Sequence, residues 1–183
     1  MRDRVYGRTD VELSAHGRDN AAQIAAALAA EPIAAIYTSP LRRARETSAP
    51  LARALGVEPV TIDDLREIDF GELEGLMISE ALARYPVEAQ WTIAPAEASF
   101  PGGEALATLR ERAVRATRAL AGRHPGETAA VFTHAVVIRA IVVDALGMPA
   151  NTLFRLDQSF GGLTVIEWLD GLPFVRAVNA TRL

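Results

Sequence analysis

Residues 33–47, IAAIYTSPLRRARET, join a short apolar run to the start of a helix. The run that ends at Ser39 predicts a buried strand, because it is short, apolar and followed by a turn. Ser39 is a favourable N-cap residue and Pro40 suits the first position of a helix, so we expect a helix from Pro40 that stops at Gly56. A strand that leads directly into a helix is typical of α/β proteins.

The rest of the chain alternates in the same way between apolar strands and helical periods. The remaining helices are predicted at 14–30, 77–84, 104–123 and 135–147, and the remaining strands at 58–62, 128–134, 162–169 and 173–179. Asp170-Gly171 separates the last two strands and is a hairpin signal. We therefore expect an α/β fold, a three-layer α/β/α sandwich with a mostly parallel central sheet and an antiparallel edge.

The composition favours a single domain, residues 1–183, with a sizeable core. Half of the chain is hydrophobic, its net charge is −4, and it has no cysteine. This charge argues against a general nucleic-acid or membrane-surface binder, and no apolar run is long enough to span a bilayer. The N-terminal stretch lacks the apolar core of a signal peptide, so a cytoplasmic location is expected. All 19 basic residues are arginine, which excludes lysine chemistry.

Arg42 and Arg43 lie at the expected start of a helix, which is the end that disfavours cations. The strands that lead into Ser39 and His134 both continue into helices, so their carboxyl ends should share one rim of the sheet. An anion bound at that rim would balance the two arginines. The alternative is that both arginines are solvated and pair with nearby acids such as Glu46.

The three histidines differ in their expected positions. His134 follows the end of a strand and is placed on the rim, but without further context a satisfied core histidine is the simpler interpretation. His124 precedes the same strand and is expected about 20 Å away, at the opposite rim. His16 falls in the first turn of the first helix and is expected to be exposed.

The loop LREIDFGELEG, residues 65–75, holds four carboxylates. Acids in loops are usually solvated, but the apolar neighbours Ile68 and Phe70 favour a partly buried carboxyl with a raised pKa, which would be a usable acid. The residues alone leave the choice open between Glu67, Asp69, Glu72 and Glu74.

Five stretches, in order along the chain, together resemble the histidine phosphatase superfamily, also called phosphoglycerate-mutase-like. They are YGRTDVELSAHG (6–17), IYTSPLRRARET (36–47), LREIDFGELEG (65–75), PGGE (101–104) and FTHAVVIRA (132–140). The likeness is collinear and runs from Tyr6 to Asn179. The GRTD segment and the short middle region resemble the phosphatase branch more than the mutases, which use additional basic residues including a lysine.

The resemblance implies a role for five residues. Arg43 would hold the phosphoryl group, Glu67 would donate a proton to the leaving oxygen, and His134 would stabilise charge on the phosphoryl oxygens. Tyr6 and Gly7 would lie at the mouth of the substrate site. These roles suit phosphoryl transfer, which needs donors around the equatorial oxygens and an acid at the departing one. The resemblance implies no metal and no cofactor, and a phosphorylated small molecule as substrate or ligand.

Two departures from the family pattern bear on activity. The family's first strand, an interior strand beside the one that ends in His134, carries an Arg-His-Gly motif whose histidine is the phosphorylated nucleophile, and no such motif precedes Tyr6. Ala135 and Val136 follow His134 where the family has glycine or small residues, and they are expected to crowd the phosphate pocket or to remove a backbone approach. The 183-residue chain by itself is therefore predicted to lack normal phosphatase activity.

Three explanations for the missing motif are open. In the one that we favour, Met1 lies downstream of the natural start, and the chain is N-terminally truncated relative to the family. In the second, the short form is real, and its sheet closes up or pairs across a homodimer; it would be a phosphate-binding pseudoenzyme, or an enzyme that uses Glu67 and His134 for other acid–base chemistry. In the third, the chain is a non-functional fragment.

The middle region also bears on the substrate. Residues 76–103 are acidic and apolar, and Arg84 is their only cation. A strongly anionic bisphosphate would be poorly bound there, so we expect a phosphomonoester with a modest or apolar leaving group.

Overall fold

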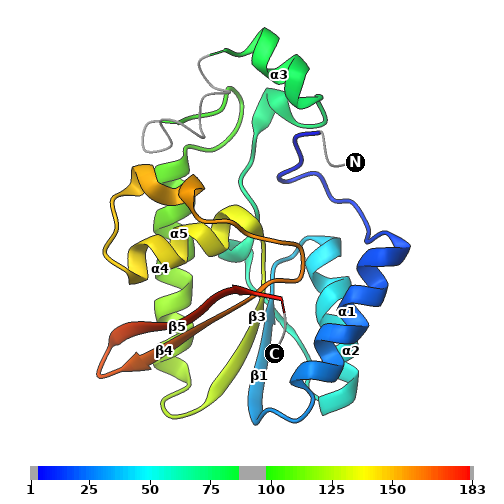
Figure 1. The fold of residues 1–183 in the computed structure, drawn as a ribbon, viewed down its shortest axis with the longest axis vertical. Coiled ribbons are helices and arrows are strands. Elements are labelled where there is room, and N and C mark those ends of the chain that lie inside the picture. Colours follow the sequence, from blue (N-terminus) through cyan, green and yellow to red (C-terminus); the bar gives the residue numbers. More distant parts are fainter. Residues whose placement is uncertain (1–3, 87–97, 182–183) are drawn as a thin grey trace.

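The computed structural model describes residues 4–86 and 98–181. Residues 87–97 lie outside the described residues. They belong to the acidic and apolar middle region from which the leaving group of the substrate was predicted. Strands and helices alternate along the chain, as expected from the sequence (Figure 1). No helix of the described segments is long and apolar enough to cross a membrane.

Three parallel strands among the described residues form the central sheet. β1 (Ile33–Thr38) lies between β2 (Val60–Thr61) and β3 (Thr128–Phe132). Thr38 pairs with Phe132, so β1 and β3 end at the same level. The backbone N–H of Ser39 extends this pairing by donating to the Phe132 carbonyl at 2.9 Å. The rim predicted from the two strand-to-helix junctions is therefore present.

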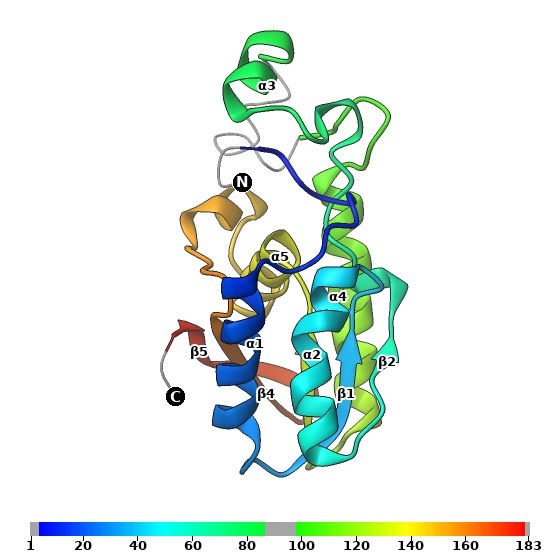
Figure 2. The same cartoon turned by 90° about the vertical axis from the view of Figure 1, so that its right-hand side faces the viewer.

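Helices cover both faces of this sheet and give the expected three layers (Figures 1 and 2). α1 (Ala15–Leu28) and α2 (Arg42–Leu55) pack on one face. α4 (Leu106–Arg123) and α5 (Ala135–Ala145) pack on the other.

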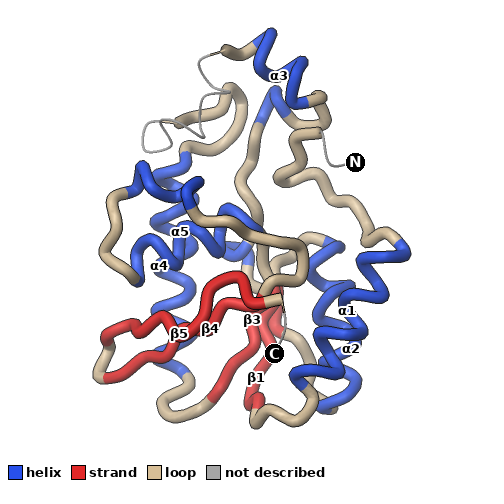
Figure 3. The backbone as a smooth tube through the Cα atoms, viewed as in Figure 1, coloured by secondary structure: helices blue, strands red, loops and turns tan. Residues whose placement is uncertain are grey.

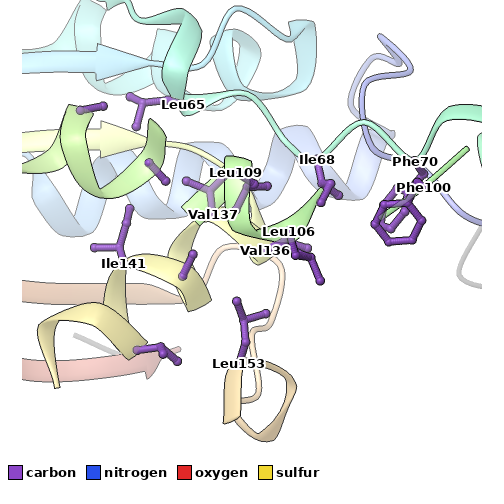
Figure 4. Close-up of a cluster of buried hydrophobic side chains, with 14 of the residues drawn as sticks. Leu65, Ile68, Phe70, Phe100, Leu106, Leu109, Val136, Val137, Ile141 and Leu153 are labelled. Atoms are coloured by element: carbon purple, nitrogen blue, oxygen red, sulfur yellow. The ribbon is translucent and has the colours of Figure 1, made fainter. Parts of the chain in front are cut away.

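A buried apolar cluster joins α4 and α5 to the acid loop, residues 65–75. Leu109 of α4 and Val137 of α5 meet near Leu65, and Ile68 lies further along the same cluster (Figure 4). The smaller cluster on the opposite face contains Ile36 of β1 and Leu51 of α2. Burial of Ile68 places the backbone of the acid loop against the core instead of in solvent.

The last two strands form a hairpin, as predicted. β4 (Leu163–Leu169) and β5 (Leu172–Ala180) pair antiparallel. Asp170 and Gly171 in the turn both have positive φ angles, 51° and 79°, which suit a two-residue hairpin turn. Within the described residues this hairpin is a separate two-stranded sheet, so it flanks the parallel sheet without hydrogen bonding to β3 (Figure 3).

The short elements lie in the connections. α3 (Ile78–Arg84) confirms the predicted helix at 77–84. Three 3₁₀ helices in the part of the chain that the structure describes were not predicted: η1 (Asp63–Leu65), η2 (Gly71–Leu73) and η5 (Ala150–Arg155).

The start of α2 differs from the prediction. The N-cap is Leu41 instead of Ser39, and the helix begins at Arg42. The Ser39 hydroxyl bonds to the imidazole of His134 at 2.7 Å and accepts the N–H of Leu41 at 3.2 Å. The predicted stop at Gly56 is confirmed, with a left-handed φ of 67°.

Candidate active site

Three sequence-predicted site residues lie at the carboxyl end of β1 and β3. Arg43 is in the first turn of α2, His134 is the N-cap of α5, and Glu67 lies between η1 and η2. Arg43 acts electrostatically on both Glu67 and His134. The fold therefore brings the three residues into one charged cluster, which we call the rim cluster.

Glu67 is the buried acid of the loop, with 7% of its surface exposed. Its carboxyl oxygens accept the N–H of Ile68 at 3.0 Å and the N–H of Val136 at 3.2 Å. Burial raises the pKa of Glu67 above its usual value, despite these two hydrogen bonds and the charges of Arg43 and Arg112. A carboxyl with a raised pKa retains its proton at higher pH and can act as a general acid.

The other three acids of the loop have structural partners. Asp69 pairs with Arg8 at 3.0 Å and accepts the N–H of Gly71. Glu72 accepts the hydroxyl of Tyr85 at 2.8 Å. Glu74 binds the N-terminal segment. Of the four acids, Glu67 is the buried one, and it lies in the rim cluster.

His134 is buried against the end of β1, with 7% of its surface exposed. Its Nε2 atom lies 2.7 Å from the Ser39 hydroxyl oxygen. Burial, together with the nearby charges of Arg43 and Arg112, lowers the pKa of His134 to about 3. The imidazole of the ligand-free protein is therefore neutral at pH 7.

The residue after Ala135 contributes to the cluster through its backbone. Val136 points its side chain into the apolar core and donates its N–H to Glu67. The expected crowding of the pocket therefore does not apply to Val136, whose side chain is 6% exposed and packs in the core.

Arg42 and Arg43 have different environments. Arg42 is exposed and pairs with Glu46 at 2.6 Å and Glu12 at 2.9 Å, which is the alternative interpretation of this residue. Arg43 is half-buried and donates to the carbonyls of Thr9 at 2.9 Å and Gly7 at 2.6 Å. Burial lowers the pKa of Arg43, although nearby carboxylates oppose the shift. Of these two arginines, Arg43 is therefore the one that places its positive charge in the rim cluster.

The N-terminal segment reaches the cluster through Gly7. The carboxylate of Glu74 accepts backbone N–H groups from Gly7, Arg8 and Thr9 and also the Thr9 hydroxyl. A Cβ atom on Gly7 would lie 1.9 Å from the carbonyl oxygen of Ile68, so only glycine fits there. The neighbouring Tyr6 is half-buried. The structure thus brings Gly7 into contact with Arg43. The predicted roles of Gly7 and Tyr6 at the mouth of the substrate site stay predictions.

Sequence reasoning missed Arg112, a buried arginine on α4. Its guanidinium pairs with Glu104 through two bonds of 2.7 and 2.8 Å. It also donates to the backbone carbonyls of Asp64, Arg66 and Glu67. Arg112 therefore fixes the segment that carries Glu67. The available signal was its position, because it lies three residues after Leu109 on the apolar face of the helix.

The other two histidines lie away from the rim cluster. His124 caps the C-terminus of α4 and bonds to the Tyr37 hydroxyl at 2.8 Å and to Glu127 at 2.8 Å. His16 is exposed at the start of α1. Both positions agree with the sequence prediction. No group of three or more His, Asp or Glu side chains in the described segments is placed to hold a metal ion.

A buried acid, a buried neutral histidine and a half-buried arginine thus lie together on one rim of an α/β sheet. The chain belongs to the histidine phosphatase superfamily (branch 1), whose family model matches residues 1–181.

Individual relatives agree with this assignment. The chain is 29% identical over 179 residues to Phosphoserine phosphatase 1 of Hydrogenobacter thermophilus, covering 97% of this chain and 85% of the relative. It is 35% identical over 150 residues to Bifunctional protein Rv2228c of Mycobacterium tuberculosis, covering 81% of this chain but only 41% of that protein. The solved structure of Bacillus stearothermophilus YhfR superposes with a TM-score of 0.92 at 29% identity, over 98% of this chain and 90% of YhfR.

Proposed function

We propose that the rim cluster is the phosphate site of a phosphomonoester phosphatase. The observation that carries this proposal is that Arg43, Glu67 and His134 lie together at the carboxyl ends of β1 and β3, close enough for the charge of Arg43 to act on the other two. Membership of the superfamily and the likeness to a phosphoserine phosphatase support it.

Each residue of the cluster has a distinct role in the proposed reaction. Arg43 and the imidazole of His134 donate hydrogen bonds to the phosphoryl oxygens and stabilise the charge that develops on them. Glu67, which burial keeps protonated to higher pH, gives its proton to the leaving oxygen. Arg112 holds the backbone of Glu67 in place.

We further propose that none of the chain's three histidines is the phosphorylated nucleophile. His16 is exposed, His124 is bonded to Tyr37 at the far end of β3, and His134 is bonded to Ser39. In the family the nucleophile comes from a strand beside the counterpart of β3, and β3 here pairs only with β1 within the described residues. The side of β3 that faces away from β1 is therefore where such a strand would pair.

A second candidate is a phospho-ligand-binding protein without catalysis. The same lack of a free histidine at the rim cluster favours it. Hydrolysis of p-nitrophenyl phosphate by a chain that also carries the nucleophile strand separates the two candidates, because a binder leaves this ester intact even then. For hydrolysis we expect a phosphomonoester with a modest or apolar leaving group, and phosphoserine is the first natural ester to try, since a relative is named for it.

Thermal unfolding in the presence of orthovanadate tests the site itself. Vanadate should raise the melting temperature of the wild type, and Arg43→Ala should remove most of that increase. Arg42→Ala is the matched control: it removes the neighbouring arginine, which is exposed and paired with Glu12 and Glu46, and should leave the increase unchanged. An equal increase in the wild type and in Arg43→Ala would contradict the proposed site.

A further inference from the structure

Ser39 lies at the boundary between β1 and α2 and is completely buried. Its backbone N–H is used by the Phe132 carbonyl, and its hydroxyl oxygen accepts the N–H of Leu41 at 3.2 Å. The hydroxyl therefore still has one hydrogen to donate, and burial denies it a water partner.

The nitrogen Nε2 of His134 is the acceptor available to that hydrogen. It lies 2.7 Å from the Ser39 oxygen, and no other acceptor among the described residues bonds to this hydroxyl. If Nε2 instead carried the proton and donated to Ser39, the serine hydrogen would be left buried without a partner, which is costly. The hydrogen-bond arrangement therefore favours a proton on Nδ1 and a lone pair on Nε2.

The other ring nitrogen is open. Nδ1 of His134 bonds to none of the described residues. Among these residues, the one side-chain nitrogen or oxygen that is fully buried without a partner is Arg110 Nε. Nδ1 is therefore not fully buried. Since the imidazole is neutral at pH 7, a single N–H is available, and its position decides which side of the ring can donate.

We propose that Ser39 is a positioning residue that holds His134 in the Nδ1–H tautomer and so directs its one N–H toward a bound oxyanion. This inference rests on the proposed phosphate site for its purpose, but the tautomer itself can be measured without a ligand.

Long-range proton–nitrogen correlation NMR of the ¹⁵N-labelled 183-residue protein at pH 7 tests the tautomer directly. The chain has three histidines, and the signals lost in His134→Gln identify the ring in question. We expect a protonated Nδ1 and an unprotonated Nε2 in the ligand-free wild type. A protonated Nε2 would overturn the inference whatever the protein binds.

Ser39→Ala tests whether the serine sets this state. We expect the His134 ring to move toward the Nε2–H tautomer or a mixture, and vanadate to bind about tenfold more weakly, the order of one charge-assisted hydrogen bond. Ser48→Ala is the matched control, because Ser48 is equally buried but bonds to Arg45 of its own helix. It should change neither the tautomer nor the affinity.

The outcomes separate this inference from the proposed function. A wild type with Nδ1–H that does not bind vanadate supports the tautomer and overturns the phosphate site. A Ser39→Ala variant that keeps Nδ1–H and full vanadate affinity overturns the role of Ser39. If Ser39→Ala does not fold, the wild-type spectrum alone decides the tautomer.

Discussion

At the residue scale, the two titratable groups of the rim cluster have pKa values shifted in opposite directions. Burial raises the pKa of Glu67, and burial lowers the pKa of His134 to about 3. A neutral pair in the ligand-free site costs less than two buried charges, and binding of a phosphate dianion would then add charge beside Arg43. Opposite shifts of this kind are typical of sites that assign an acid to one residue.

The lowered pKa of His134 has a consequence for stability. A histidine binds a proton below pH of about 6.5 in the unfolded chain but only below about 3 in the folded one. Its contribution to the free energy of unfolding is therefore present above pH 6.5 and is lost as the pH falls toward 3. Glu67 has the opposite effect. Because its pKa is higher in the folded state than in the unfolded chain, its contribution lowers the free energy of unfolding as the pH rises above the pKa of the unfolded chain.

We expect His134→Gln to remove the first of these effects. Between pH 4 and 6, the free energy of unfolding of the wild type should rise relative to that of the variant by up to about 1.4 kcal/mol per pH unit, the limit for one proton. Urea unfolding at several pH values measures this difference. Parallel curves for the two proteins would contradict a neutral, buried His134.

At the element scale, α4 supports the acid loop through Arg112. This side chain is 7% exposed and joins Glu104 to three backbone carbonyls of residues 64–67. Removing one partner of a buried ion pair leaves the other charge without compensation. The helix therefore does more than cover the sheet: it fixes the segment from which Glu67 reaches the rim.

Arg112→Met should accordingly destabilise the protein by about 3–5 kcal/mol. Arg115→Met on the same helix is the control. The Arg115 side chain is 66% exposed, so its ion pair with Asp64 contributes at most about 1 kcal/mol to stability. Chemical denaturation of both variants measures the two losses. Equal losses of stability in the two variants would show that Arg112 does not fix the segment that carries Glu67.

The same elements show what a sequence can predict. The strand at 33–38 and the helix that ends at Gly56 were predictable because apolar runs, helical periods and a glycine stop are local signals. The bond from the Ser39 hydroxyl to a histidine 95 residues away was not predictable, because no local signal encodes a contact over that separation. The choice of Glu67 among four acids was equally out of reach, since its burial depends on α5.

At the scale of the whole molecule, β3 is an edge strand within the described residues. The Phe132 carbonyl accepts a hydrogen bond from the β1 side. Because backbone groups alternate along a strand, those of Ala130 also face β1. The backbone N–H and C=O groups of Ala129 and Val131 face the opposite side. The Val131 side chain is 38% exposed. This open side is where the proposed nucleophile strand, or a second copy of the chain, would pair.

Amide hydrogen exchange tests this edge in the 183-residue protein. We expect the amides of Ala129 and Val131 to exchange much faster than those of Ala130 and Phe132, because only the latter pair is bonded within the sheet. Slow exchange at all four positions would mean that another strand covers β3. Slowing that grows with protein concentration would identify that strand as part of a second copy.

The fold class, the parallel sheet and the shared rim followed from sequence, but the separation of the β4–β5 hairpin from that sheet did not. Asp170-Gly171 specifies a turn locally, whereas attachment to β3 depends on backbone groups that no local pattern encodes. Arg43, Glu67 and His134 were all predicted from the family resemblance, and the structure places them together at the rim. Their supporting residues, Ser39 and Arg112, emerged only from the three-dimensional packing.

A crystal structure of the chain with bound orthovanadate tests the central claim most directly. The rim cluster predicts one vanadate that contacts both the guanidinium of Arg43 and Nδ1 of His134, with the Glu67 carboxyl facing it. Vanadate bound elsewhere, or contacting only one of Arg43 and His134, would contradict the claim that these residues form a single phosphate site.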